Sequence, residues 1–260
     1  MDTTHYSMEH IEVAGHRLEY YWTRPLGADE TALIFLHEGL GSAQLWRDFP
    51  SRVADATGHP ALVYSRYGYG GSDVLGEPRG VDYMHQEALE ALPALREKLG
   101  LDRPILIGHS DGASIALIHA GAGRWPVRGL ALMAAHVFVE DQSTTGIEAA
   151  KAAYQTTDLP QKLARHHVDA DKTFFGWNDI WLDPAFRDWN IENVLPAIQC
   201  LTLVVQGEDD EYGTMDQVTA IRDQVADPVE TLVLANCGHS PHRDQPAQTL
   251  DAITGFIKNL

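Results

Sequence analysis

Ser110 stands in a sequence setting that is typical of a covalent nucleophile. It is the central residue of a G-x-S-x-G pattern at residues 108–112. An apolar run precedes this pattern, and a segment of small residues with helical periodicity follows it. In such a strand-to-helix turn, glycines avoid side-chain clashes and the start of the helix favours developing negative charge. The pattern alone is common by chance, so its strand-turn-helix context is what predicts a catalytic serine.

A serine hydroxyl is a poor nucleophile unless a base takes its proton, and that base needs an acid to orient it. Two loops after Ser110 carry such groups, each directly behind an apolar run: residues 206–213 and 236–242. If both runs are strands of one parallel sheet, their carboxyl ends meet at the edge where such sheets place their sites. His239 is the predicted base. His242 is the weaker alternative because it lies further along the chain, toward the last helix.

The predicted acid belongs to a run of four carboxylates at residues 208–211. An acidic run is usually a solvated loop, yet one of these four has to orient His239. Asp210 is favoured by its place beyond the turn at Gly207. Three other carboxylates remain as alternatives, in decreasing order: Asp209, and then Glu140 and Asp141 after the sixth predicted strand.

The oxyanion formed during acyl transfer needs two N–H donors. The residue after the nucleophile, Asp111, supplies one of them. The other is expected from the loop after the predicted strand at residues 33–36, which reads His-Glu-Gly-Leu-Gly-Ser over residues 37–42. Gly39 is the predicted second donor.

Apolar runs and helical segments alternate along most of the chain. Residues 9–13 and 17–22 alternate around Ala14-Gly15, which predicts a β-hairpin. Six later runs look like strands buried on both faces: 32–36, 61–64, 105–107, 130–134, 201–205 and 232–234. Five segments have the helical repeat: 43–56, 83–99, 111–122, 215–225 and 246–257, with Gly58 and Gly100 placed as helix ends. This order predicts an α/β fold with a mostly parallel, doubly wound sheet of about eight strands.

Residues 139–199 interrupt this alternation, because they contain short helical pieces and no convincing strand. They predict a helical cap inserted after strand six into a core of residues 1–138 and 200–260. The cap is rich in aromatic residues: Phe174, Phe175, Trp177, Trp181, Phe186 and Trp189. Most of these are expected to attach the cap to the sheet, with one or two facing the pocket. The candidate pocket residues are Glu38, His136, Phe175, Trp177 and Trp181; His136 fits a structural role equally well.

The bulk composition narrows the class of partner. Nineteen basic against 37 acidic residues give a formal charge of −18, which disfavours nucleic acid and anionic lipid. No apolar run is long enough to span a bilayer, and MDTTHYSMEH at the start lacks the features of a leader, so a cytoplasmic protein is expected. Neither C-x-x-C nor H-E-x-x-H occurs, so no metal site is predicted. The expected partner is a small-molecule substrate, and the oligomeric state stays open.

Along its whole length the sequence resembles the α/β-hydrolase superfamily. Five motifs occur in family order: the loop at 37–39, the R-Y-G-Y-G-G-S-D segment at 66–73, the elbow at Ser110, Gly207-x-x-Asp210 and Gly238-His239-x-Pro241. The resemblance implies Ser110 as nucleophile, Asp210 as acid, His239 as base, and Gly39 and Asp111 as oxyanion donors. Glu38 departs from the family, which usually has glycine there. This departure leaves the geometry of the oxyanion loop open and adds a carboxylate near the site.

A serine at the elbow argues against the dehalogenase and epoxide hydrolase branches, which use aspartate. Ser110-Asp111-Gly112, together with residues 139–141, resembles the valacyclovirase-like amino-acid ester hydrolases and small carboxylesterases. In the valacyclovirase-like enzymes the acid after the nucleophile recognises a substrate ammonium, so Asp111 is a candidate for that role. The simpler interpretation is that Asp111 caps the elbow helix and lends its N–H.

These residues predict a serine hydrolase that cleaves a small carboxylic ester, including an amino-acid ester, through an acyl-enzyme and without a cofactor. Carbon-carbon bond hydrolysis of a meta-cleavage product, thioesterase activity and lactonase activity are alternatives. A ligand receptor on the same fold is a more remote one.

Overall fold

One sheet of eight strands forms the centre of the molecule. The computed structural model describes residues 6–260. Residues 1–5, the first half of the segment that was examined for a leader, lie outside the described residues. The strand order across the sheet is β1 (Glu9–Val13), β2 (His16–Trp22), β4 (Ala61–Tyr64), β3 (Leu33–Leu36), β5 (Ile105–His109), β6 (Gly129–Met133), β7 (Thr202–Gly207) and β8 (Val229–Leu234). The hairpin β1–β2 and the pair β2–β4 are antiparallel, and all other pairs are parallel. The predicted fold class is therefore confirmed.

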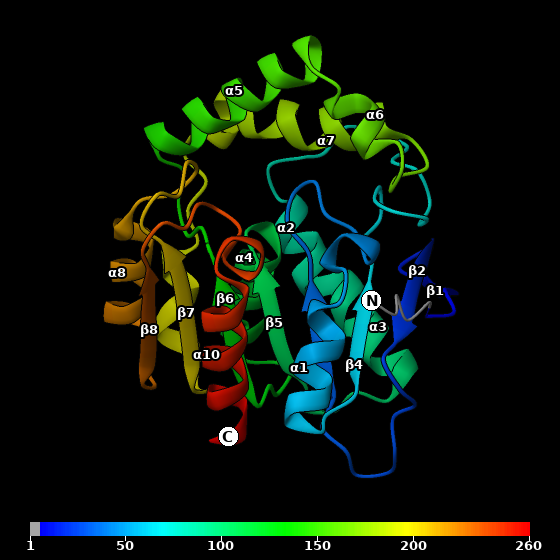
Figure 1. Cartoon of the computed structure of the whole chain (residues 1–260), viewed down its shortest axis with the longest axis vertical. Helices are drawn as coiled ribbons and strands as arrows, with labels where there is room; N and C mark the ends of the chain where they lie inside the picture. The colour runs from blue at the N-terminus through cyan, green and yellow to red at the C-terminus, as the bar shows by residue number, and fades with distance from the viewer. Residues whose placement is uncertain (1–5) are drawn as a thin grey trace.

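Helices cover both faces of this sheet (Figure 1). Helices α1 (Phe49–Thr57) and α10 (Pro246–Lys258), which follows the short α9 (Pro241–Asp244), pack on one face. The other face is covered by α4 (Asp111–Gly121), α8 (Met215–Gln224) and a continuous helical run made of α2 (Tyr83–Gln86), the π-helical turn η2 (Glu87–Ala91) and α3 (Leu92–Leu99). No helix in the described part of the chain is both long and apolar enough to cross a membrane.

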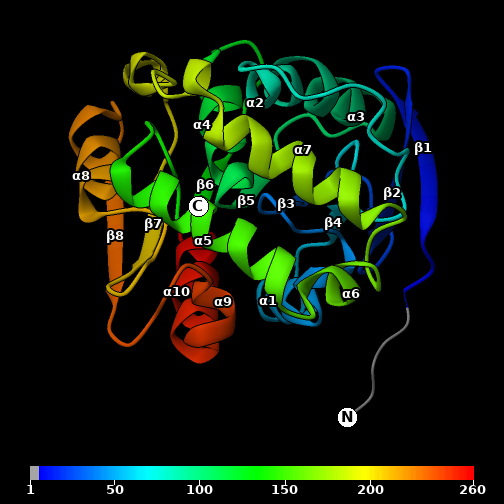
Figure 2. The same cartoon turned by 90° about the horizontal axis from the view of Figure 1, so that it is seen from above.

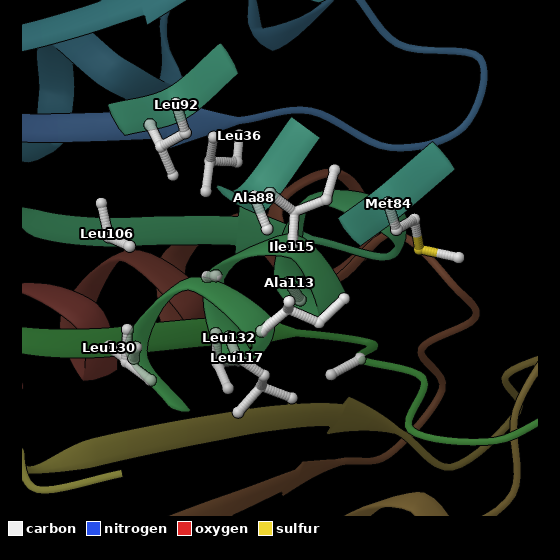
Figure 3. Packing of buried hydrophobic residues seen from close by; sticks show 14 of the residues in the cluster. Leu36, Met84, Ala88, Leu92, Leu106, Ala113, Ile115, Leu117, Leu130 and Leu132 are labelled. Atoms are coloured by element: carbon white, nitrogen blue, oxygen red, sulfur yellow. The ribbon is translucent and has the colours of Figure 1, made fainter. Parts of the chain in front are cut away.

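Successive side chains of the central strands enter opposite cores. In β3, Leu33 and Phe35 pack on the side of α1 and α10, whereas Ile34 and Leu36 pack on the side of α4. Figure 3 shows Leu36 and further leucines of β5 and β6 around α4 and the neighbouring helical run. Because both faces are buried, these strands read as unbroken apolar runs.

Most predicted elements agree with the structure to within one or two residues at each end, but β8 and the helix predicted over residues 43–56 differ more. Strand β8 begins at Val229, three residues before its predicted start. The apolar pattern missed these residues because β8 is the edge of the sheet and its polar residues face solvent. The single helix predicted over residues 43–56 is wrong. Arg47 has a positive φ of 53°, and it separates a 3-10 turn, η1 (Gln44–Trp46), from α1. Pro50 stands in the first turn of α1, where it needs no N–H partner.

The first part of the segment between β6 and β7 lies over the carboxyl ends of the strands (Figures 1 and 2). The whole segment contains α5 (Asp141–Thr156), α6 (Leu159–Leu163), α7 (Ala170–Leu182), and the 3-10 turns η3 (Pro184–Phe186) and η4 (Glu192–Ala197). Helices α5 and α7 pack on each other above the sheet, whereas η4 packs against α4 and α8. The division into a core domain and a cap of residues 139–199 stays a prediction, and the packing of η4 favours an earlier end for the cap.

Two glycines on the same face of the sheet allow a matched test of backbone strain. Gly58 ends α1 with a left-handed φ of 76°, whereas Gly255 lies inside α10, and a Cβ would meet open space at both positions. We expect Gly58→Ala to lower the free energy of unfolding by about 1–2 kcal/mol, because alanine disfavours the left-handed region. Gly255→Ala should raise it by about 0.5–1 kcal/mol. Urea unfolding measures both, and equal signs would contradict the assignment.

Candidate active site

Ser110 is held in a strained conformation between β5 and α4. Its φ of 53° and ψ of −119° lie in a region that non-glycine residues rarely occupy. The surroundings hold this conformation in place: the Ser110 N–H donates to the Met133 carbonyl of β6 (2.9 Å), and the Ser110 carbonyl accepts from the Ala113 N–H (2.8 Å). Strain of this kind persists only where neighbouring bonds enforce it, and it is concentrated at functional sites.

The two glycines around Ser110 are required by close packing. A Cβ on Gly112 would lie 2.0 Å from the carbonyl oxygen of Leu36, and a Cβ on Gly108 would lie 2.5 Å from the Cα of Ala113. Both obstacles are backbone atoms, which cannot move without shifting β3 or α4. The G-x-S-x-G pattern therefore marks the place where α4 approaches the sheet directly.

The structure brings His239 and Asp210 together. The loop after β8 places His239 Nδ1 2.9 Å from both carboxylate oxygens of Asp210, which follows β7. The Asp210 carboxylate also accepts from Gln206 Nε2 (2.7 Å) and from the Tyr212 N–H (2.8 Å). The Gly213 N–H donates to it as well (3.3 Å). Its position is thus fixed by four donors, and it selects the Nδ1–H form of the His239 ring.

The charges of this pair reinforce each other. Burial alone would raise the pKa of Asp210, but the hydrogen bond and charge of His239 and the Tyr212 N–H lower it to about 2. Burial alone would lower the pKa of His239, but the hydrogen bond and charge of Asp210, followed by the charges of Glu211 and Glu38, raise it above its ordinary value of 6.5. Asp210 is therefore ionised, and His239 is poised to accept a proton at its free Nε2.

Ser110 and His239 line the same cavity, which has a volume of about 230 Å³. Among residues 6–260, no hydrogen bond joins their side chains. Such bonds are often long in the absence of substrate and tighten when it binds. The carboxyl ends of three strands, β5, β7 and β8, thus bring a nucleophile, an acid and a base to one place.

The alternative residues lie elsewhere or have other partners. Asp209 is exposed, and Asp141 is exposed and paired with Arg187. Glu140 accepts hydrogen bonds from Thr214 and Gln217 beside α8. His242 is buried against Trp46 and Phe49 and does not line the cavity, and burial holds its pKa well below the usual range.

Two peptide groups are oriented so that their N–H groups can serve the cavity. The Glu38 carbonyl accepts from His37 Nδ1 (2.7 Å) and from Arg66 Nη2 (3.0 Å). The N–H of a trans peptide points opposite to its carbonyl, so the Gly39 N–H points away from both donors. The Ser110 carbonyl is held by the first turn of α4, so the Asp111 N–H likewise points away from that helix. Gly39 and Ser110 both line the cavity.

His37 and Arg66 were not singled out from the sequence as positioning residues, although both stand in motifs that it shows. Both are buried. His37 Nε2 accepts from the Arg66 N–H (3.0 Å), which leaves Nδ1–H to donate to the Glu38 carbonyl. Burial and the charge of Arg66 hold the pKa of His37 well below its usual range, so the ring is neutral and this donor pattern is fixed.

The Asp111 side chain lies behind the elbow and not in the cavity. It is fully buried, accepts from the Tyr83 hydroxyl (2.8 Å) and lies 3.6 Å from Arg66 Nη2. It is absent from the cavity lining. Both expected roles for this carboxylate therefore need correction: it does not reach the cavity to bind a substrate ammonium, and α4 begins after Ser110 without a side-chain cap, while Tyr83 and Arg66 contact Oδ2.

Four of the five predicted pocket residues line the cavity. They are Glu38, His136, Trp177 and Trp181. Phe175 instead faces a separate hollow that α7 shares with residues 75–79. Residues that the sequence did not predict as pocket residues complete the lining: Leu40, His109, Ser143, Ile147, Glu211, Tyr212, Ser240 and Arg243. They come from α5, α9 and the strand ends, which only the tertiary fold brings together.

Glu38 and His136 add polar groups to the wall. Glu38 Oε1 lies 3.3 Å from Arg243 Nη2, and its Oε2 lies 3.4 Å from His109 Nδ1. Burial would raise the pKa of Glu38, but His109, Arg243 and His242 hold it well below the usual range. Burial and then the charge of His239 lower the pKa of His136 to about 3, so its ring is neutral. Direct substrate contact by either residue stays a prediction.

Two tryptophans of α7 bring the cap down onto the site. A Cβ on Gly39 would lie 2.0 Å from Trp177 Nε1, so this indole rests directly on the oxyanion loop. Trp181 packs edge-on against His136, with ring centroids 5.3 Å apart. Phe174, Phe186 and Trp189 pack in the core that attaches the cap. The expectation that one or two of the six aromatic residues face the pocket agrees with this arrangement.

Comparisons with known proteins identify the family and the fold. Residues 33–252 match the model of the alpha/beta hydrolase family. The chain is 33% identical to the proline iminopeptidase of Lactobacillus delbrueckii subsp. bulgaricus, over 88% of this chain and 90% of that protein.

Two solved structures share the fold. The proline iminopeptidase of Mycobacterium smegmatis superposes with a TM-score of 0.73 at 19% identity, covering 97% of this chain and 98% of that one. The enol-lactonase of Burkholderia xenovorans LB400 superposes with a TM-score of 0.75 at 18% identity, covering 96% and 99%.

The contact between Gly39 and Trp177 can be tested by a double-mutant cycle. We expect Gly39→Ala to lower the free energy of unfolding by about 1–3 kcal/mol, because the new methyl group collides with the indole. In a Trp177→Ala background the same substitution should cost little, since the obstacle is gone. Urea unfolding of the four proteins measures the coupling. Equal costs of Gly39→Ala in the two backgrounds would contradict the contact.

Proposed function

The chain belongs to the alpha/beta hydrolase family, and we propose that it is a serine hydrolase that cleaves a small ester or amide through an acyl-enzyme on Ser110. The proposal rests on one observation, which is that three features occur together at one cavity. These are the strained Ser110, the fixed His239–Asp210 pair and two N–H groups with the right orientation.

In the proposed acylation, His239 Nε2 takes the hydroxyl proton as Ser110 Oγ attacks the substrate carbonyl. Asp210 stabilises the imidazolium that forms. The oxyanion lies on the N–H groups of Gly39 and Asp111. His239 then gives its proton to the leaving alcohol or amine, which departs and leaves an acyl-serine.

Deacylation repeats these steps with water as the nucleophile. His239 takes a proton from water, the hydroxide attacks the acyl carbonyl, and the same two N–H groups hold the second oxyanion. Collapse returns the proton to Ser110 and releases the acid. These steps use only groups of this chain, substrate and water, so a small molecule is the proposed partner and no cofactor takes part.

Removal of the nucleophile tests the mechanism directly. We expect a fluorophosphonate probe to label the wild-type protein at Ser110 and Ser110→Ala not to react. Asp210→Asn should lower kcat by about 10⁴, because it removes the charge that stabilises the imidazolium and disturbs the choice of tautomer. Hydrolysis of a p-nitrophenyl ester with a short acyl chain provides the assay. A folded wild-type protein that resists the probe would favour a ligand receptor on the same fold.

The same site sets the pH dependence. A general base must be unprotonated, so kcat/KM should rise with pH as His239 loses its proton. Because the pKa of His239 is raised above 6.5, the midpoint of this limb should lie above pH 6.5.

Amino-substituted acyl groups are the second candidate for the substrate class. The Glu211 carboxylate lines the cavity beside His239, and one of its oxygens accepts a hydrogen bond from the backbone N–H of His239 (3.1 Å). Among residues 6–260, nothing else forms a hydrogen bond or ion pair with this carboxylate. It is therefore placed to receive a substrate ammonium, whereas the Asp111 carboxylate is buried and does not line the cavity. Relatives named proline iminopeptidase support this class and add amides to the esters suggested by the sequence.

Glu211→Gln separates this candidate from a general esterase. We expect the variant to lose about tenfold in kcat/KM for an aminoacyl p-nitroanilide or ester relative to its des-amino analogue, which corresponds to about 1.4 kcal/mol. The glutamine side chain still accepts a hydrogen bond from the backbone N–H of His239. Any change in the basicity of the His239 ring affects both substrates equally. The ratio therefore isolates the ammonium contact. An unchanged ratio would rule out an ammonium site at Glu211.

The remaining alternative reactions would use the same nucleophile, Ser110. Spectral loss of a meta-cleavage compound in place of p-nitrophenol release would indicate carbon-carbon bond hydrolysis. Preference for a thioester or a lactone over the matched open-chain ester would indicate a thioesterase or a lactonase.

A further inference from the structure

A chain of buried polar contacts connects the cap to the residue after the nucleophile. In α7, Trp181 Nε1 donates to the Tyr83 hydroxyl (3.0 Å). The Tyr83 hydroxyl donates in turn to Asp111 Oδ2 (2.8 Å). These three side chains are no more than 4% exposed and come from three elements, α7, α2 and α4. The cap and the elbow thus share one hydrogen-bond chain.

Arg66 extends this chain to the other side of the candidate oxyanion hole. Its Nη2 lies 3.6 Å from Asp111 Oδ2 and donates to the carbonyls of His37 (3.2 Å) and Glu38 (3.0 Å). The Glu38 carbonyl belongs to the peptide whose N–H is the Gly39 donor. One buried guanidinium therefore contacts the peptide of one oxyanion donor and the side chain of the residue that supplies the other.

The direction of each bond in the chain is settled. Burial and the charge of Asp111 raise the pKa of Tyr83 well above its ordinary value, so the hydroxyl keeps its proton. An indole N–H can only donate, so Tyr83 accepts from Trp181 and has its own proton for Asp111. Tyr83 thus joins Trp181 to the Asp111 carboxylate by two hydrogen bonds.

We propose that Tyr83 is a positioning residue, which couples the seating of the cap, through Trp181, to the placement of the two oxyanion donors through Asp111 and Arg66. The proposal rests on the proposed function, because it assigns the N–H groups of Gly39 and Asp111 to the oxyanion. Tyr83 itself does not line the cavity.

The physical reason is that oxyanion donors act only when their direction is fixed before the charge develops. Loss of one donor typically costs about 10²–10³ in rate. The Asp111 carboxylate anchors the first turn of α4, and without the Tyr83 hydroxyl it keeps only the contact with Arg66 at 3.6 Å. Arg66 would then be free to follow Asp111 and draw the Glu38 carbonyl with it. Both donors would lose preorganisation, although the triad would stay intact.

Tyr83→Phe is the test, with Tyr64→Phe as its matched control. Tyr64 is also buried and also donates to a buried carboxylate, that of Glu87 (2.8 Å), but that bond does not reach Asp111. Both variants lose one hydroxyl and one hydrogen bond to a carboxylate. If the two variants have similar unfolding free energies, a difference between their kcat values therefore reports on the hydrogen bonds from Trp181 through Tyr83 to Asp111 and not on general stability.

We expect Tyr83→Phe to lower kcat for a p-nitrophenyl ester about tenfold with little change in KM, and Tyr64→Phe to leave both unchanged. A trifluoromethyl ketone, which forms a tetrahedral oxyanion on serine, should bind Tyr83→Phe more weakly by the same factor as the fall in kcat. The carboxylic acid product, which forms no such oxyanion, should bind it as well as it binds the wild type. Equal kcat values in the two phenylalanine variants would overturn the proposal.

A double-mutant cycle tests whether Trp181 acts through Tyr83. Trp181→Phe should lower kcat in the wild type, and it should add little to Tyr83→Phe, because the link is already broken. Additive losses would show that Trp181 acts through the cavity wall alone. Fluorophosphonate labelling of Ser110 keeps the two hypotheses apart. A protein that is not labelled refutes the proposed function, whereas a labelled protein whose Tyr83→Phe and Tyr64→Phe variants behave alike refutes only this inference.

Discussion

The left-handed backbone of Ser110 is the constraint on which the rest of the structure depends. A non-glycine residue in such a region costs about 1–3 kcal/mol, so it persists only where the surrounding structure leaves no relaxed alternative. Here the Ser110 N–H is bonded to β6 and its carbonyl is bonded to α4. Gly112 lets that helix approach β3 so closely that a Cβ there would lie 2.0 Å from the Leu36 carbonyl oxygen. The apolar residues on both faces of the sheet supply the packing that keeps these elements from relaxing.

Behind the elbow, the structure buries two charged side chains, Arg66 and Asp111. An isolated buried ion is very costly, whereas one with a counter-ion and hydrogen bonds is tolerated. Arg66 and Asp111 are each other's counter-ions, and Tyr83 and the carbonyls of residues 37 and 38 supply further hydrogen bonds, although Arg66 Nε and Asp111 Oδ1 have no partner in the described part of the chain. Because these partners are also the supports of the oxyanion donors, the polar groups that are costly to bury are the same ones that orient the site. The acidic surface that gives the chain its charge of −18 is a separate matter, since it is solvated.

The sequence was sufficient to predict the elements that depend on local pattern. It predicted the order of strands and helices, the turn at Ser110 and the loops that carry Asp210 and His239, because periodicity and motif spacing are properties of consecutive residues. It was not sufficient where a distant contact decides. Asp111 looks like a site residue by its position in the motif, and only the folded chain shows that Tyr83 occupies its carboxylate. Phe175 and Trp177 are two residues apart in one aromatic segment, yet the rotation of α7 sends them into different hollows.

Glu38 shows how the fold accommodates a residue that departs from the family pattern. Glycine is usual at this position, and a side chain there would be expected to disturb the peptide that follows it. In this chain the carbonyl of that peptide is fixed by His37 and Arg66, so its N–H direction does not depend on the side chain of residue 38. The carboxylate is drawn aside by Arg243 and lies beside His109. Orientation of the Gly39 donor therefore comes from a buried guanidinium and a neutral imidazole, which leaves position 38 free to contribute charge to the cavity wall.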